Sequence, residues 1–290
     1  MASMKKLDPE TRAQVLHLLM EGNSIRGTAR LTGVSKTTIL KLVEDAGHAA
    51  AWYQDRVFQN LQCTKIQADE IWGFVGSKAA NTSAEKKAAG EAGDVWLWIA
   101  TCADTKLVPS WFLGPRDAES AYAFMYDLSE RLANRVQLTS DGLRVYIDAV
   151  WKNFGENIDF GQLVKLYGPG PEGQRRYSPA ECIGITKNPV FGNPDAKYIS
   201  TSFSERNNLN VRMHSRRMTR LTNGFSKKLE NHACAMALHF LYYNFVRVHH
   251  TLKVSPAMAA GVTKRLWEMK DVVDMLEAWE VKAKPSSTRD

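Results

Sequence analysis

Three acidic residues occupy sequence contexts from which their side chains could meet at one site. Asp69 lies in a run with strand character, KIQADEIWGFV at 65–75, and Asp141 ends another such run immediately before Gly142. Glu205 lies in the first turn of a predicted helix. Two carboxylates on neighbouring strands and one on a helix beside them could converge at one edge of a sheet.

Converged carboxylates repel one another, and a divalent cation removes that cost. Oxygen-only ligands suit Mg²⁺ or Mn²⁺ rather than zinc. Two such ions activate water or a 3′-hydroxyl and stabilise the leaving oxygen in phosphoryl transfer. The chain has 31 acidic residues, so residue types alone leave open that these three are unrelated surface acids. Asp69 and Glu70 point to opposite faces of a strand, so only one can serve the site, and periodicity does not choose between them.

The elements that must position these acids follow an α/β order. Strands are expected at 65–75, 94–104, 106–114 and 135–142, with a helix at about 117–133 before the last of them. A helix near 143–154 follows, and further helices are expected at 204–219, 227–251 and 263–281. Two Gly/Pro-rich patches, YGPGPEGQ and NPVFGNPD, predict an irregular insertion around 155–200. This order could build a mixed five-stranded sheet with flanking helices.

A separate helical unit precedes the strands. Asp8 with Pro9, Ser24 and Ser35 are helix-start signals, and Gly33 supplies the permissive backbone of a tight turn between the second and third helices. The spacing matches a helix-turn-helix, although a generic three-helix bundle has the same pattern. In a helix-turn-helix the start of the last helix reaches base edges in the major groove. Those residues here are Lys36, Thr37, Thr38 and Lys41.

The positive charge of the chain is concentrated after Glu205. The 290 residues carry 38 Lys+Arg and 31 Asp+Glu, a net charge of +7, whereas residues 205–265 alone carry eleven basic and two acidic side chains, a net +9. On a helix, Asn208, Arg212 and Arg216 share the face of Glu205. They and Arg217 are candidate contacts to a DNA backbone, although a solvated basic face is the alternative interpretation. In the later segment YYNFVRVHHTL, Arg247 and His249 could contact nucleic acid, while His232 and His239 upstream read as core residues.

Composition narrows the class of protein. An apolar content of 44% excludes a largely disordered chain, and no apolar run is long enough to span a membrane. The four cysteines are far apart and form no CxxC pair, so a zinc ribbon or finger is not indicated. Scattered cysteines are typical of a reducing cytoplasm, and we expect a cytoplasmic, nucleoid-associated protein.

Three segments in order, ADEIWGFVGSK, TSDG and FSERNNLNVR, resemble the DDE transposases of the insertion-sequence-one type. The resemblance covers roughly residues 8–262 and includes the closing YYNFVRVHHTL and SPAMAAG. It implies a ribonuclease-H-like catalytic domain in which Asp69, Asp141 and Glu205 hold two Mg²⁺ or Mn²⁺ ions. It also implies a bacterial enzyme that cleaves transposon-end DNA and joins it to target DNA, as a homodimer or higher assembly.

The resulting domain prediction has five parts. These are a helix-turn-helix domain at 1–46, a linker at 47–64, a catalytic domain at 65–262 with its insertion around 155–200, a C-terminal helix at 263–282 and a disordered tail at 283–290. Two other functions stay open. One is a domesticated DNA-binding protein or regulator without transposition activity, and the other is a nuclease that cleaves without strand transfer.

Overall fold

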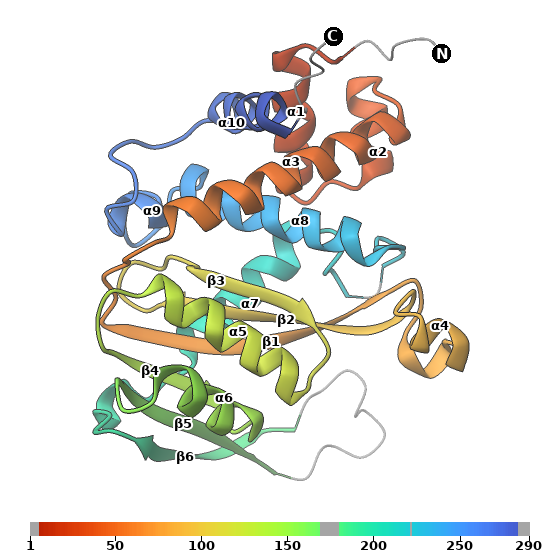
Figure 1. The fold of residues 1–290 in the computed structure, drawn as a ribbon. Coiled ribbons are helices and arrows are strands. Elements are labelled where there is room, and N and C mark those ends of the chain that lie inside the picture. The colour runs from red at the N-terminus through yellow and green to blue at the C-terminus, as the bar shows by residue number, and fades with distance from the viewer. Residues whose placement is uncertain (1–5, 169–179, 221, 284–290) are drawn as a thin grey trace, which may run out of the picture. The chain divides into compact units, whose positions relative to one another are not determined.

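The computed structural model describes residues 6–168, 180–220 and 222–283 (Figure 1). The chain forms two compact units. The first comprises Met1–Phe58, Trp72–Val95 and Asn208–Asp290, and the second comprises Gln59–Ile71 and Trp96–Asn207. Each unit is described separately below.

Three helices open the first unit: α1 (Pro9–Met20), α2 (Ile25–Thr32) and α3 (Lys36–Val57). The predicted capping residues begin them, because the side chains of Asp8, Ser24 and Ser35 each accept a hydrogen bond from a backbone N–H three residues on. Gly33 ends α2 at a φ of 72°, the left-handed conformation that glycine adopts without strain. The helix-turn-helix signals in the sequence are therefore confirmed.

The third helix is longer than the sequence suggested. It continues through residue 46 to Val57, so residues 47–57, assigned to a linker, are helical. Its buried face extends without a break through Ala46, Ala49 and Ala50. Alanine-rich packing of this kind carries little hydrophobic periodicity, which is why the sequence placed the end of the helix too early.

Farther along the chain this unit also contains α8 (Leu229–Leu241), a π-helical turn at Tyr242–Val246, α9 (Pro256–Ala259) and α10 (Met269–Ala283). Figure 1 shows α3 and α8 lying side by side. His232 and His239 are buried, as expected for core residues, and burial lowers the pKa of His232 to about 4 and that of His239 to about 3. The predicted disordered tail from residue 284 lies outside the described residues.

A mixed sheet runs through the second unit with the strand order β3-β2-β1-β4-β5-β6. Its strands are β1 (Lys65–Val75), β2 (Gly93–Cys102), β3 (Ser110–Gly114), β4 (Val136–Asp141), β5 (Ile158–Tyr167) and β6 (Cys182–Phe191). β1, β4 and β5 pair in parallel, whereas β2 with β3 and β5 with β6 pair antiparallel. The expected mixed α/β sheet is confirmed, but it has six strands rather than five.

The sixth strand explains the miscount. β5 and β6 both fall in the segment 155–200, where the sequence predicted an irregular insertion. β6 carries Pro189 and Gly184, which resemble loop signals, but β6 is an edge strand and an edge strand tolerates proline. Residues 169–179 of that predicted insertion lie outside the described part of the chain.

Two helices, α5 (Ala118–Arg131) and α6 (Val145–Phe154), lie side by side next to the sheet (Figure 1). Trp98 of β2 is fully buried and contacts Phe124 of α5 and Tyr146 of α6, so it belongs to the core of this unit. Short helical segments complete the fold: 3₁₀ turns at Ala79–Asn81 and Ala196–Tyr198, and α4 (Ala84–Ala88). The helix α7 (Ser202–His214) leads from the second unit into the first.

The α3–α8 contact yields a first prediction. A Cβ added at Gly47 would lie 2.4 Å from the Cβ of Cys234, so Gly47→Ala must force the helices apart. We expect it to lower the free energy of unfolding by about 1–3 kcal/mol, despite alanine's better helix propensity. Urea unfolding measures the change.

The matched control is Gly27→Ala in α2, where the added Cβ would meet only the flexible side chain of Ser24 at 3.2 Å. That variant should stay within about 1 kcal/mol of the wild type. Equal stability of the two alanine variants would contradict the close-contact argument.

Candidate functional site

The register between β1 and β4 brings two of the predicted acids together. Lys65 pairs with Gln137 and Gln67 with Thr139, an offset of 72 residues, and the same 72 positions separate Asp69 from Asp141. On parallel strands about 4.8 Å apart, residues at equal register point to the same face. Asp69 and Asp141 are therefore neighbours across the two strands.

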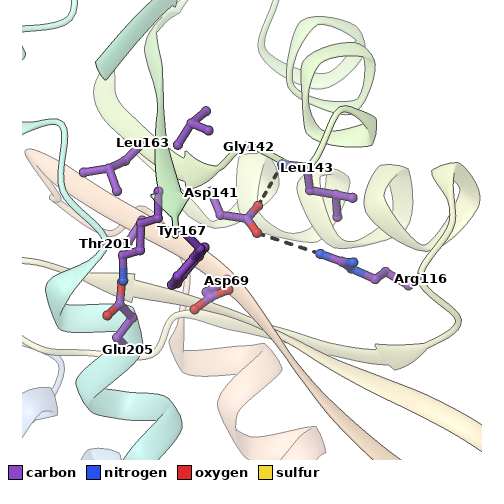
Figure 2. Close-up of a pocket in the computed structure, with 11 residues that line it drawn as sticks. Asp69, Arg116, Asp141, Gly142, Leu143, Leu163, Tyr167, Thr201 and Glu205 are labelled. Atoms are coloured by element: carbon purple, nitrogen blue, oxygen red, sulfur yellow. Dashed lines mark hydrogen bonds and ion pairs between the residues drawn. The ribbon is translucent and has the colours of Figure 1, made fainter. Parts of the chain in front are cut away.

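All three predicted acids line one pocket of about 610 Å³, which lies within the second unit (Figure 2). Asp141 ends β4, where its Oδ1 accepts the Leu143 backbone N–H at 3.0 Å. Asp69 is half-buried on β1, and Glu205 extends from the first turn of α7. The pocket wall also includes Arg116, Lys165, Tyr167 and Thr201.

A glutamine that the sequence did not single out positions Glu205. Gln67 is buried on β1 two residues before Asp69, and its Oε1 accepts the backbone N–H groups of Phe203 and Ser204 at 2.7 and 3.2 Å. These N–H groups belong to the first turn of α7, so the Gln67 side chain satisfies donors that have no partner within the helix. The buried Asn207 adds a bond to Thr101 at 3.2 Å. The start of α7 is thereby tied to β1 and β2.

Glu70 has a different environment from that of Asp69, its neighbour on β1. Its side chain is 1% exposed and accepts bonds from Arg116 Nε at 2.7 Å and from the Tyr146 hydroxyl at 3.1 Å. Burial, and then the charge of Asp141, raise the pKa of Glu70, and Arg116 opposes that rise. Because Asp69 lines the pocket and Glu70 does not, the geometry makes the choice that periodicity left open.

Burial, and then the negative charges of Glu70, Asp141 and Glu205, raise the pKa of Asp69 to about 7. Carboxylate oxygens of Asp69, Glu70 and Asp141 all lie within 4.8 Å of one another. The Glu70 carboxylate is held by Arg116 and Tyr146, which leaves Asp69 and Asp141 as the donors that suit an oxygen-preferring divalent cation such as Mg²⁺ or Mn²⁺, whose charge would relieve the repulsion. Asp69 and Asp141 would hold it, with Glu205 at the same pocket.

Two basic side chains, Arg116 and Lys165, complete the pocket. The Lys165 Nζ lies 2.6 Å from Oε1 of Glu205, which also accepts the Thr201 hydroxyl at 2.5 Å. Arg116 lies 3.8 Å from Asp141, as Figure 2 shows, and its guanidinium stacks over Trp96. The sequence pointed to neither residue, because a single Lys or Arg on or near a strand carries no recognisable pattern.

The basic residues after Glu205 have mixed environments. Arg212 donates to the backbone carbonyls of Trp72 and Met218, both at 2.9 Å, and burial followed by the charge of Arg220 lowers its pKa to about 10. Arg217 donates to Ser226 at 2.8 Å, and burial lowers its pKa. These guanidinium groups therefore hold the local chain in place.

The predicted helical face beyond Glu205 is shorter than expected, because α7 ends at His214 and not at residue 219. After His214 the chain turns back, and the Thr219 hydroxyl donates to the Arg212 carbonyl at 3.0 Å. Arg216 is exposed beyond the helix, whereas Asn208 is half-buried within it. The face shared with Glu205 thus extends only as far as Arg212.

In the segment YYNFVRVHHTL, Asn244 is fully buried and donates to Gln54 at 3.4 Å. Tyr242 is buried and donates to Glu21 at 2.6 Å. Arg247 and His249 are half-buried, and His249 bonds to Thr251 at 3.1 Å. Asn244 and Tyr242 are therefore structural, and DNA contact by Arg247 and His249 stays a prediction.

At the start of α3, Lys36 and Thr37 are exposed and Thr38 is half-buried. Both threonine hydroxyls lie within 3 Å of Ser35 Oγ, at 2.9 and 2.8 Å. Lys41 is exposed and forms an ion pair with Asp45 at 2.8 Å. Lys36 and Thr37 are thus the most accessible of the four predicted base-contacting residues.

Comparison with known families supports this domain. Residues 5–45 match the family model of the helix-turn-helix domain of resolvase, which spans α1, α2 and the first part of α3. The chain therefore has an N-terminal helix-turn-helix of the resolvase type, which indicates DNA binding. A search of curated proteins finds no match. Within the residues that the structure describes, no helix has the length and apolar character to cross a membrane.

The ion pair between the buried Glu70 and the partly exposed Arg116 yields a second prediction. Arg116→Gln should lower the free energy of unfolding by about 2 kcal/mol or more, because it leaves the Glu70 carboxylate buried without its counter-charge. The double variant Glu70→Gln with Arg116→Gln should recover most of that loss. Lys65→Gln, which breaks the more exposed pair with Asp104, should cost less than about 1 kcal/mol. A double variant as unstable as Arg116→Gln would contradict the assignment of Arg116 as the counter-charge of the buried Glu70 carboxylate.

The helix-turn-helix yields a third prediction. Lys36→Ala should weaken binding to double-stranded DNA and lower the magnitude of the log–log salt slope by about 1, because it removes one positive charge from the DNA-binding surface. Fluorescence anisotropy over a range of salt concentrations measures this slope. Lys270→Ala removes the same charge from an exposed position on α10 and should leave the slope unchanged. An unchanged salt slope in Lys36→Ala would show that DNA does not contact Lys36 at the start of α3.

Proposed function

We propose that this protein is a DDE transposase of the insertion-sequence-one type, with a ribonuclease-H-like domain in its second unit. The observation that carries the proposal is the convergence of Asp69, Asp141 and Glu205 on one pocket, although 72 and 64 residues separate them in sequence. They stand in the three segments that carry the family resemblance. The resolvase-type helix-turn-helix adds the DNA-binding domain that such an enzyme needs.

The strand arrangement also supports the proposal. Five of the six strands, in the order β3-β2-β1-β4-β5, form the mixed sheet that the resemblance implies, with β6 added at the edge. Two acids lie on the adjacent central strands β1 and β4, and the third lies on the helix tied to β1 by Gln67. A pure DNA-binding protein has no need of such an arrangement.

In the proposed reaction, Asp69, Asp141 and Glu205 hold two Mg²⁺ or Mn²⁺ ions. Bound there, the ions supply Lewis-acid stabilisation of charge on the phosphate and lower the pKa of the attacking hydroxyl. Water attack on the phosphodiester would break its P–O3′ bond, which frees a 3′-hydroxyl at the transposon end and leaves a 5′-phosphate on the other fragment. That 3′-hydroxyl would then attack a phosphodiester of the target DNA, forming the new P–O3′ bond and releasing a 3′-hydroxyl of the target strand as leaving group. Lys165, 2.6 Å from Glu205, has the position and charge to contact a phosphate that enters the pocket.

Partners follow from this chemistry. The helix-turn-helix would bind the transposon ends, and the pocket would take the scissile phosphate of an end and then of the target. Joining two ends in one event requires at least two active sites, so we expect a homodimer or a higher assembly. The cytoplasm, in association with the nucleoid, is the compartment where such DNA is available.

Two observations favour a second candidate function. Glu205 already forms an ion pair with Lys165, and the family match covers only the helix-turn-helix. Both features suit a domesticated DNA-binding regulator that retains the fold without transposition. A nuclease that cleaves without strand transfer is the third possibility, and an assay with pre-cleaved ends separates it from a transposase.

The catalytic proposal yields a fourth prediction. Asp69→Asn, Asp141→Asn and Glu205→Gln should each reduce Mg²⁺-dependent cleavage by at least about a hundredfold, because each removes several kcal/mol of transition-state stabilisation. The substrate is the terminal DNA that flanks the gene. DNA binding by the helix-turn-helix should survive in all three variants.

Glu156→Gln removes an exposed carboxylate outside the pocket and serves as the control. It should cleave like the wild type. Specific DNA binding without cleavage by the folded wild-type protein, under any divalent cation, would favour the regulator. Cleavage that persists in the Asp69 and Glu205 variants would show that the assignment of the three acids is wrong.

A further inference from the structure

A second cluster of metal-ligand side chains lies in the first unit, where α3 packs against α8. Gly47 of α3 faces Cys234 of α8 so closely that an added Cβ would lie within 2.5 Å of the Cys234 backbone. This absence of a side chain lets the two helix backbones approach. Side chains that flank the contact on both helices are thereby brought together.

Each helix contributes two of these side chains at a spacing of four residues. Glu44 and His48 lie on α3, and Glu230 and Cys234 lie on α8. Residues four apart share one face of a helix, so each pair points in a common direction. No sequence pattern indicates this cluster, because 186 residues separate the pair on α3 from the pair on α8 and neither pair belongs to a CxxC motif.

The separations between ligand atoms suit a zinc ion. His48 Nε2 lies 3.5 Å from Glu230 Oε1 and 3.7 Å from Cys234 Sγ. In a tetrahedral zinc site, bond lengths of about 2.0 Å for nitrogen or oxygen and about 2.3 Å for sulfur give a nitrogen–oxygen edge of about 3.3 Å and a nitrogen–sulfur edge of about 3.5 Å. One ligand atom from each of Glu44, His48 and Glu230 also lies within 4.8 Å of the other two.

From this geometry we infer that Glu44, His48, Glu230 and Cys234 form a binding site for Zn²⁺. A thiolate, an imidazole and two carboxylates suit zinc and not Mg²⁺, which prefers oxygen alone. The site differs in both chemistry and location from the carboxylate pocket of the second unit. It goes beyond the proposed transposase function and does not depend on it.

Neighbouring side chains orient the ligands of the cluster and leave the cluster open to solvent. The imidazole of His48 stacks on Trp279 of α10, with ring planes 15° apart, which limits its rotation. Lys41 bonds Asp45 at 2.8 Å and lies farther from Glu44, at 3.9 Å, so Glu44 can turn to a metal without losing a close partner. The side chains of His48 and Glu230 are 45% and 64% exposed, which gives an ion a path from solvent.

A bound zinc ion would join the third helix of the helix-turn-helix domain to α8. Four bonds from two helices would reinforce a contact in which Gly47 lets the backbones of α3 and α8 approach. Binding to the folded state alone raises stability by mass action. The inferred role of the site is therefore structural, because all four tetrahedral positions are supplied by the protein.

Titration of the full-length, reduced protein with Co²⁺ tests the inference, because cobalt bound to a thiolate gives a charge-transfer band in the near ultraviolet. We expect one equivalent of Co²⁺ to produce this band together with tetrahedral visible bands, and Zn²⁺ to displace them. Cobalt bound at Asp69 and Asp141 gives no thiolate band, so the readout reports the new site alone. Zn²⁺ should also raise the thermal unfolding temperature.

Cys234→Ser should abolish the thiolate band and the zinc-induced shift in unfolding temperature. If Cys234→Ser does not fold, His48→Gln provides the test, because it alters only a half-exposed side chain and should keep the fold. His48→Gln should weaken Co²⁺ binding at least about tenfold. The control is Cys182→Ser, an exposed cysteine of the second unit, which should behave like the wild type. A folded wild-type protein without the band, or a band lost in Cys182→Ser and kept in Cys234→Ser, would overturn the inference.

Discussion

Repulsion between carboxylates fixed by backbone register is the constraint on which the second unit depends. The parallel pairing of β1 with β4 makes Asp69 and Asp141 neighbours. Because the backbone sets this spacing, rotation of the side chains cannot separate the two strands. The consequence is visible in the pKa of Asp69, raised to about 7 by burial and by nearby negative charge. Arg116 on Glu70 and Lys165 on Glu205 offset part of that charge within the protein itself. A divalent cation would offset the rest, and this is the physical link between the fold and the proposed phosphoryl transfer.

The positions of the acids have separate causes, which combine at one pocket. Strand register sets the two aspartates, whereas the third acid depends on the buried amide of Gln67, which accepts the N–H groups that begin α7. The DNA-binding helices belong to the other unit and have their own core, built where α3 packs on α8 through Gly47. DNA binding and the proposed chemistry would therefore be carried by different parts of the chain.

Much of this could be predicted from the sequence, for physical reasons that differ by element. The helix-turn-helix was readable because capping by Asp8, Ser24 and Ser35 and the glycine turn are local effects. The three acids could be proposed, but their convergence depends on pairing across 72 residues, which local pattern does not encode. β6 was missed because an edge strand tolerates the proline and glycine that signal loops elsewhere. Gln67, Arg116 and Lys165 were missed because their roles exist only once distant strands and helices meet.

Iron-directed cleavage tests, without DNA or turnover, the proposal that Asp69, Asp141 and Glu205 together hold a divalent cation. Fe²⁺ in place of Mg²⁺, with ascorbate and peroxide, cuts a backbone close to the bound ion. If these residues hold the ion, we expect backbone cuts near residues 69, 141 and 205. Excess Mg²⁺ should suppress the cuts, and Asp141→Asn should show none. Cuts that leave those three positions intact while Fe²⁺ binds the folded protein would contradict it.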